Sequence, residues 1–211
     1  MLPSLAIGLL NGFYLESLHA LNPLWFWMAD IAQYVLVPGV VFYALLRYGG
    51  IRPNQYGYKA ITASDLIGLT ALITFIFWLS YKPLGILFSI LLGTTDPEFG
   101  YASTIPQPTV LHAITVLYFA VTAALVEETV FRALPWLYIM RLPASRFDRF
   151  NIPAYVLCSS ILFGLVHWEN GLHEVLSTFV LGVIACLLYS RIRNIWPLVG
   201  AHFLTDVYIF W

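Results

Sequence analysis

Long uninterrupted apolar runs restrict the fold of this chain more than any other feature. The clearest run extends from Leu24 to Leu46 and is closed by Arg47 and by the pair Gly49 and Gly50. About 20 consecutive apolar residues suffice for a helix to cross a bilayer. The alternation of apolar and polar residues that a membrane β-barrel needs is not seen in these runs. Because lipid offers the backbone no hydrogen-bond partners, the sequence predicts membrane-spanning helices.

Composition supports this interpretation. Of the 211 residues, 60% are hydrophobic and only 10% are charged, and the mean hydropathy is +0.81. A soluble domain carries about 25% charged residues. The composition therefore excludes a soluble globular enzyme, a disordered protein and a nucleic-acid binder with a basic face, and no electrostatic partner follows from the net charge of −1. With no internal repeat or linker, residues 1–211 are expected to form one domain: an all-α, polytopic transmembrane helix bundle of about six to eight helices.

The remaining apolar runs predict where further helices lie. They are Asp65–Leu92, Thr109–Leu134 with a stop near Pro135, Ile152–Val166, Val175–Tyr189 and Ile195–Phe210. Lys82 and Pro83 interrupt the first of these, which is therefore either one kinked helix or a span followed by a short re-entrant piece. Whether residues 4–20 also span is left open, because that segment carries several polar side chains.

The connections between these runs alternate in charge. Three of them are basic and contain Arg47, Arg52 and Lys59, then Arg141, Arg146 and Arg149, and finally Arg191 and Arg193. The two connections between them contain no Lys or Arg, but do contain Asp96, Glu98, Glu169 and Glu174. The positive-inside rule places the basic connections in the cytoplasm. We expect a multi-pass integral protein of a prokaryotic cytoplasmic membrane.

Ionisable residues inside the apolar runs are the candidate functional residues. Insertion of one such residue at the centre of a membrane helix costs about 2.5–3.5 kcal/mol. Its presence in a span therefore indicates a functional role by default. Apart from the isolated Asp30 in the run Leu24–Leu46, they concentrate in the second half of the chain: Glu127, Glu128, Arg132, His167, His202 and Asp206.

Helical spacing assigns these residues to pairs. Glu128 and Arg132 are four residues apart, with the acid first, which favours an ion pair within the helix. Glu127 points about 100° away around the same helix. Arg132 can therefore neutralise Glu128 and leave Glu127 as a candidate proton acceptor.

The other two candidate helices show a similar regularity. His202 and Asp206 are four residues apart, so the carboxylate can orient the imidazole. Ser160 and Gly164 form a pair of small residues that allows a neighbouring helix to approach closely. Three helices are thus predicted to converge on a pocket lined by Glu127, His167 and His202.

These residues lie in three short motifs that resemble those of one protein family. The run Glu127–Arg132 resembles the Glu-Glu-x-x-x-Arg motif of the CPBP family (CAAX prenyl protease and bacteriocin-processing, or Abi) of intramembrane glutamate-dependent endopeptidases. Phe163–His167 is similar to its Phe-x-x-x-His motif, and His202–Asp206 to its last motif, His-x-x-x-Asn/Asp. The resemblance covers roughly residues 117–207, the expected catalytic core.

The resemblance implies an intramembrane endopeptidase and a role for each residue. Glu127 would activate the attacking water with support from His167, while His202 and Asp206 would stabilise the oxyanion. Glu128 and Arg132 would support the site structurally. Prenyl-protein endopeptidases have Asn at the last position; Asp206 would instead hold His202 protonated.

The sequence leaves open which substrate is cleaved and whether a metal takes part. The implied substrate is a peptide or protein at the lipid bilayer, cleaved near a prenylated C-terminus, a leader peptide or a sorting signal of an exported protein. No cofactor is expected, although zinc bound by Glu127, His167 and His202 is an alternative.

Two other functional classes fit the same residues. One is a non-catalytic immunity or scaffold protein in the membrane. The other is a small proton-coupled transporter in which Glu127, His167 and His202 relay protons, as intramembrane acids and histidines often do.

Overall fold

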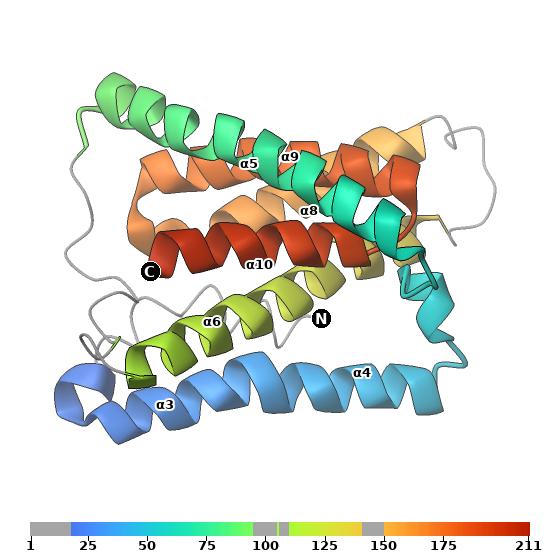
Figure 1. Ribbon diagram of the computed structural model, residues 1–211, viewed down its shortest axis with the longest axis horizontal. Coiled ribbons are helices and arrows are strands. Elements are labelled where there is room, and N and C mark those ends of the chain that lie inside the picture. The colour runs from blue at the N-terminus through green and yellow to red at the C-terminus, as the bar shows by residue number, and fades with distance from the viewer. Residues whose placement is uncertain (1–17, 95–104, 106–109, 141–149) are drawn as a thin grey trace.

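A computed structural model describes residues 18–94, 105, 110–140 and 150–211, and these residues form helices and connections without any strand (Figure 1). The predicted all-α helical bundle is thereby confirmed. Most of the segment 4–20 and the charged residues Asp96, Glu98, Arg141, Arg146 and Arg149 lie outside the described residues, so those predictions stay predictions.

In the described ranges, six continuous helical segments have 15 residues or more. They are α3 (Pro23–Ile31) joined through the π-helical turn η1 (Ala32–Leu36) to α4 (Val37–Arg47); α5 (Ala63–Leu92); α6 (Val110–Glu128) joined through the π-helical turn η4 (Thr129–Ala133) to α7 (Leu134–Ile139); α8 (Asn151–Leu165); α9 (Leu172–Ile192); and α10 (Trp196–Phe210). Two short 3₁₀ turns are η2 (Pro53–Tyr56) and η6 (Trp168–Asn170).

Length divides these segments into two groups. Four are long and apolar enough to cross a bilayer: Pro23–Arg47, Ala63–Leu92, Val110–Ile139 and Leu172–Ile192. The helices α8 and α10 have 15 residues each, which gives about 22 Å at a rise of 1.5 Å per residue. They are therefore shorter than the hydrocarbon core of about 30 Å, and neither is among the four helical segments long enough to cross it.

The stop predicted near Pro135 is wrong, because the helix continues to Ile139. A proline has no N–H for the carbonyl four residues earlier, and in a regular helix its ring clashes with that carbonyl. Here the wider turn η4 comes two residues before Pro135. The Phe131 carbonyl instead accepts a hydrogen bond from the Ser159 hydroxyl of α8. A neighbouring helix thus satisfies the group that the proline leaves free.

The first long segment repeats this arrangement. The π-helical turn η1 ends two residues before Pro38, as η4 ends two residues before Pro135. In both cases the helix continues beyond the proline. The two wide turns belong to neighbouring segments, because η1 contacts α6.

The apolar run Asp65–Leu92, which Lys82 and Pro83 interrupt, forms part of one continuous helix. Of the two alternatives left open by Lys82 and Pro83, the structure has the continuous helix α5, with Pro83 inside it. The Thr62 hydroxyl accepts a hydrogen bond from the Asp65 backbone N–H and thereby caps its first turn.

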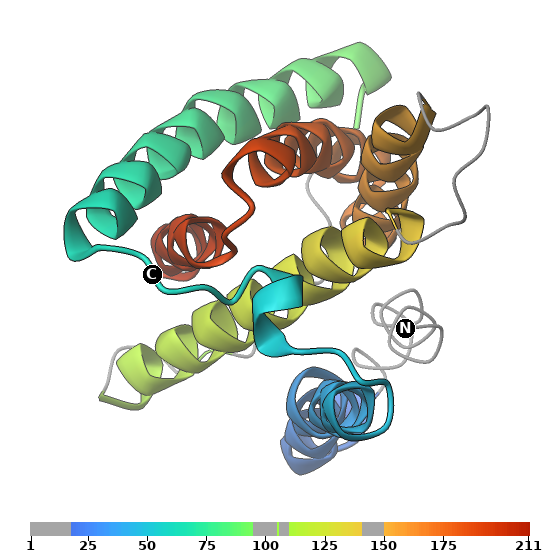
Figure 2. The same ribbon diagram turned by 90° about the vertical axis from the view of Figure 1, so that its right-hand side faces the viewer.

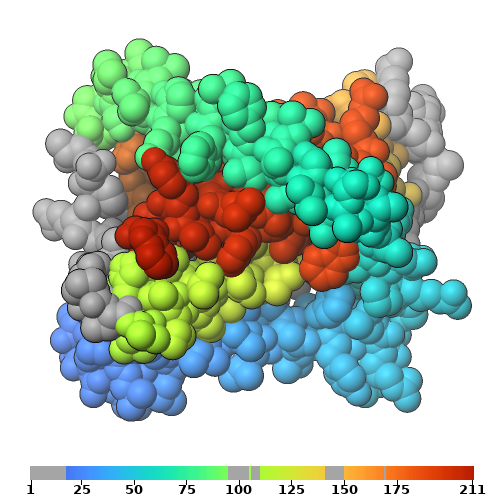
Figure 3. Space-filling model, viewed as in Figure 1, coloured from blue at the N-terminus to red at the C-terminus, as the bar shows by residue number. Residues whose placement is uncertain are grey.

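Close helix packing holds the second half of the chain together. α8 and α9 form a hairpin in which small residues face each other: a Cβ added at Gly182 would lie 3.1 Å from the Ser160 Cα, and one added at Gly164 would lie 2.7 Å from the Val175 carbonyl oxygen. α10 packs against both α5 and α6 and is visible between them on one face (Figure 3). The segment α3–η1–α4, seen end-on in Figure 2, lies at the edge of the molecule, and its turn η1 contacts α6.

The connection after α4 packs onto the turn between α9 and α10. The Ile195 backbone N–H donates to the Gly57 carbonyl at 2.9 Å, and the Asn194 amide donates to the Lys59 carbonyl at 3.2 Å. Gly57 has φ +85°, and a Cβ there would lie 2.8 Å from the Tyr189 hydroxyl, so this contact requires glycine. Two of the basic connections therefore lie at the same end of the molecule, as their common predicted side of the membrane requires.

The role of Ser159 can be tested by its removal. Ser159→Ala should lower the free energy of unfolding by about 1–3 kcal/mol, because the buried Phe131 carbonyl loses its donor. Ser160→Ala is the matched control, since the Ser160 hydroxyl donates to the Val156 carbonyl of its own helix. Melting temperatures in one detergent measure both effects. Equal melting temperatures for the two variants would contradict this account of how Pro135 is accommodated.

Candidate active site

Two helical segments bring five of the six candidate residues to one region. The last turn of α6 carries Glu127 and Glu128, and the adjoining η4 carries Arg132. Helix α10, which packs against α6, carries His202 and Asp206. The acidic residues of this group are buried: their exposed fractions are 8% for Glu127, 0% for Glu128 and 9% for Asp206.

His202 lies at the centre of the group. Its Nδ1 is 2.9 Å from Glu128 Oε1 and takes part in a hydrogen bond with it. Its Nε2 is 3.4 Å from Asp206 Oδ2 and 3.8 Å from Glu127 Oε2. One imidazole thus contacts three carboxylates that come from two helices.

Glu128 has two partners. Its Oε2 is 3.3 Å from Arg132 Nε, the pairing that the four-residue spacing predicts, and its Oε1 faces His202. Arg132 is 1% exposed, and its guanidinium lies 4.0 Å from the centre of the Phe163 ring, a cation–π contact. Glu128 therefore joins the arginine to the histidine rather than serving the arginine alone.

His167 lies next to this group without a direct polar bond to it. Its Nδ1 is 2.8 Å from the Phe163 carbonyl oxygen, one turn earlier in the chain. The Phe163 ring contacts both histidines, with ring centres 4.9 Å from His167 and 6.5 Å from His202. In the part of the chain that the structure describes, no hydrogen bond or ion pair joins His167 to Glu127 or His202. The predicted convergence of three helices is therefore mediated by Phe163.

Two tyrosines near the site have no counterpart in the predicted set. The Tyr34 hydroxyl of η1 donates to Glu127 Oε1 at 3.4 Å. The Tyr58 and Thr129 hydroxyls are 2.6 Å apart, and burial raises the pKa of the Tyr58 phenol, so it stays neutral. The sequence gives no spacing signal for either contact, because each joins segments more than 70 residues apart in the chain.

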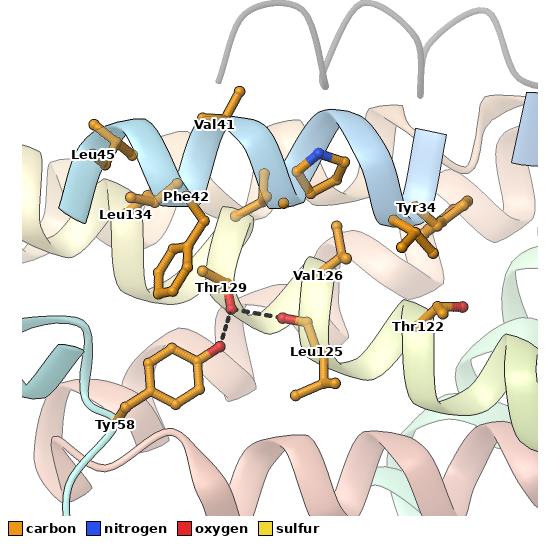
Figure 4. A pocket seen from close by; sticks show the side chains of 14 residues that line it. Tyr34, Val41, Phe42, Leu45, Tyr58, Thr122, Leu125, Val126, Thr129 and Leu134 are labelled. Atoms are coloured by element: carbon orange, nitrogen blue, oxygen red, sulfur yellow. Dashed lines mark hydrogen bonds between the residues drawn. The ribbon is translucent and has the colours of Figure 1, made fainter. Parts of the chain in front are cut away.

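An apolar pocket of about 300 Å³ adjoins the site (Figure 4). It lies between the α3–η1–α4 segment and the α6–η4–α7 segment. Its lining comprises Tyr34, Val35, Pro38, Gly39, Val41, Phe42, Leu45, Tyr58, Thr122, Leu125, Val126, Thr129, Val130 and Leu134. Because Tyr34 both lines the pocket and contacts Glu127, the pocket lies beside the carboxylate.

The described residues do not bring together a full set of side-chain ligands for a metal ion. No group of three or more His, Cys, Asp or Glu side chains in those ranges is arranged to hold a metal ion. His167 uses its Nδ1 for the Phe163 carbonyl, which leaves only its other ring nitrogen for any further partner.

The double role of Glu128 predicts a loss of stability when its charge is removed. Glu128→Gln leaves Arg132 buried without a countercharge, and breaking a buried pair from one side costs about 3–5 kcal/mol. The variant should therefore show a lower melting temperature or lower yield. The double variant Glu128→Arg with Arg132→Glu should recover part of that stability. A melting temperature for Glu128→Gln equal to that of the wild type would contradict the assignment.

A comparison with known protein families finds a match over the region that contains the candidate residues. Residues 108–208 match the family model described as type II CAAX prenyl endopeptidase Rce1-like. The match contains all six candidate residues, whereas no curated protein and no solved structure matches the chain. Over residues 108–208, the chain is similar to the CAAX protease (CPBP) family of intramembrane endopeptidases.

Proposed function

We propose that this protein is an intramembrane endopeptidase that hydrolyses a peptide bond of a membrane-associated or exported precursor, in a prokaryotic cytoplasmic membrane. One observation carries the proposal: the Glu127 carboxylate lies beside an imidazole that two further carboxylates hold in place. The similarity of residues 108–208 to that family supports proteolysis at the level of reaction class.

Glu127 is the general base in this mechanism. Its carboxylate takes a proton from water, and the resulting hydroxide attacks the carbonyl carbon of the scissile bond. The tetrahedral intermediate then collapses, the carbon–nitrogen bond breaks, and the proton passes to the departing amine. Glu128 is unsuited to this role, because Arg132 and His202 already engage both of its oxygens.

His202 and Asp206 stabilise the oxyanion of the intermediate. A hydrogen bond to Glu128 fixes the ring at Nδ1, so Nε2 is the nitrogen left to face the reacting group. As an imidazolium, His202 donates from both nitrogens, and the neighbouring carboxylate of Asp206 favours that form. The developing negative charge would therefore meet a fixed donor in a buried site, where such donors are most effective.

His167 assists the water. Since a carbonyl oxygen only accepts, the contact with Phe163 requires the proton on Nδ1. In the neutral ring, Nε2 is then an acceptor that can orient a water molecule toward Glu127. This mechanism uses no metal, and we expect cleavage to continue after exhaustive chelation.

Replacement of the base tests the proposal most directly. Glu127→Gln keeps the shape of the side chain but cannot accept the proton, so cleavage should fall by about 10²–10⁴-fold with an unchanged melting temperature. The substrates are a prenylated peptide with a CAAX-type C-terminus and a set of leader peptides, and the products are read by mass spectrometry. Asp30→Asn is the matched control, because Asp30 is also a buried acid, 1% exposed, but pairs with Tyr118 outside the His202 group.

The alternative functions correspond to other outcomes of the same experiment. Near-normal turnover by Glu127→Gln would contradict the role of that residue. Wild-type protein that cleaves none of the peptides but conducts protons in vesicles would select the transporter. Wild-type protein that does neither would select the immunity or scaffold protein. Loss of cleavage on chelation, restored by zinc, would overturn the metal-free mechanism.

The apolar pocket is suited to bind a hydrocarbon part of the substrate. A Cβ added at Gly39, which lines the pocket, meets nothing within 4 Å, so a larger side chain fits at the edge of the pocket without a clash. Gly39→Leu should therefore raise KM about tenfold and leave kcat nearly unchanged, since it removes ground-state binding.

Gly68→Leu is the control for this substitution. Gly68 also lies inside a long helix and has free space around an added Cβ, but it does not line the pocket. Steady-state kinetics on both variants separate KM from kcat. If Gly39→Leu and Gly68→Leu have the same KM as the wild type, the pocket does not bind substrate.

A further inference from the structure

The segment Pro23–Arg47 precedes the residues that match the family model, yet it supplies a side chain to the candidate site. We propose that Tyr34 of this segment is a positioning residue, which holds the Glu127 carboxylate in the orientation that water activation needs. The proposal rests on the function proposed above and adds to it a residue from outside the matched region.

The first observation is that the two oxygens of the Glu127 carboxylate contact side chains from two different helical segments. Oε1 accepts a hydrogen bond from the Tyr34 hydroxyl at 3.4 Å, and Oε2 faces His202 Nε2 at 3.8 Å. Two contacts on opposite oxygens restrict rotation of the carboxylate plane. A general base must be aligned with the proton it accepts, and hydrogen bonds at a catalytic site are often long before the substrate binds.

The second observation is the backbone conformation at Tyr34. Tyr34 is the middle residue of the π-helical turn η1, and its carbonyl is the one that Pro38 would clash with in a regular helix. A π-helical turn changes the direction in which the side chains of a helix point, and such turns are frequent at functional sites. Pro38 thus gives a reason in the sequence for the altered helix that carries the tyrosine to Glu127.

The third observation is the place of the Tyr34 ring. The ring lines the apolar pocket, while its hydroxyl contacts the carboxylate. A substrate group that fills the pocket therefore touches the same side chain that holds the base. Phenylalanine at this position would keep the lining of the pocket and remove only the donor.

A purely structural role is the competing explanation, and the chain contains a matched pair with which to test it. Tyr118 of α6 donates to Asp30 of α3 at 2.8 Å, and Asp30 is 1% exposed. This bond joins the same two helical segments as the bond between Tyr34 and Glu127. It has no contact with the His202 group among the described interactions.

The experiment compares Tyr34→Phe, Tyr118→Phe and Glu127→Gln in one detergent, with cleavage of the prenylated peptide and the melting temperature as readouts. Tyr34→Phe should lower kcat about tenfold or more, keep KM within about twofold, and melt close to the wild type, because a donor to a charged group is lost at the site. Tyr118→Phe should lower the melting temperature and leave kcat of the folded protein unchanged.

The outcomes separate this proposal from the one it rests on. If Glu127→Gln is inactive while Tyr34→Phe has the kcat of the wild type, Tyr34 has no positioning role and the proposed function stands. A lower melting temperature of Tyr34→Phe with unchanged kcat assigns it the structural role and also overturns the proposal. Turnover by Glu127→Gln at the rate of the wild type overturns both proposals.

Discussion

The contact between His202 and three buried carboxylates is the interaction on which the rest of the site depends. Burial of a charged group is costly unless an opposite charge or a hydrogen bond compensates it. Arg132 and Glu128 compensate each other, and Glu128 extends that pairing to the imidazole. Because these groups come from α6, η4 and α10, the packing of α10 against α6 and the electrostatics of the site require each other.

Two prolines and two π-helical turns shape the helices around this group. Pro38 and Pro135 each lie two residues after the end of such a turn, and both lie in helices that continue unbroken. The freed Phe131 carbonyl is satisfied by Ser159, so the irregular turn is tied to α8. The wide turns carry Tyr34 and Arg132, and the pocket lies between their segments. The irregular part of each of these two long helices therefore supplies one side chain to the site.

Contacts within one helix could be predicted from the sequence, whereas contacts between helices could not. Spacing of four residues identifies the pairs Glu128–Arg132 and His202–Asp206, because helical geometry alone brings them together. The bonds of His202 to Glu128 and of Tyr34 to Glu127 depend on how helices pack, and no pattern in the chain encodes them. The stop predicted near Pro135 was wrong for the same reason, since the compensating hydroxyl belongs to another helix.

The central claim is that Glu127 activates water rather than attacking the substrate itself. A single turnover of the prenylated peptide in H₂¹⁸O distinguishes the two, with mass spectrometry of the new peptide C-terminus and of the enzyme peptide that contains Glu127. If Glu127 is a general base, one ¹⁸O enters the new carboxylate of the product and none enters the enzyme. Incorporation of ¹⁸O into the Glu127 carboxylate would show a covalent intermediate and contradict the account.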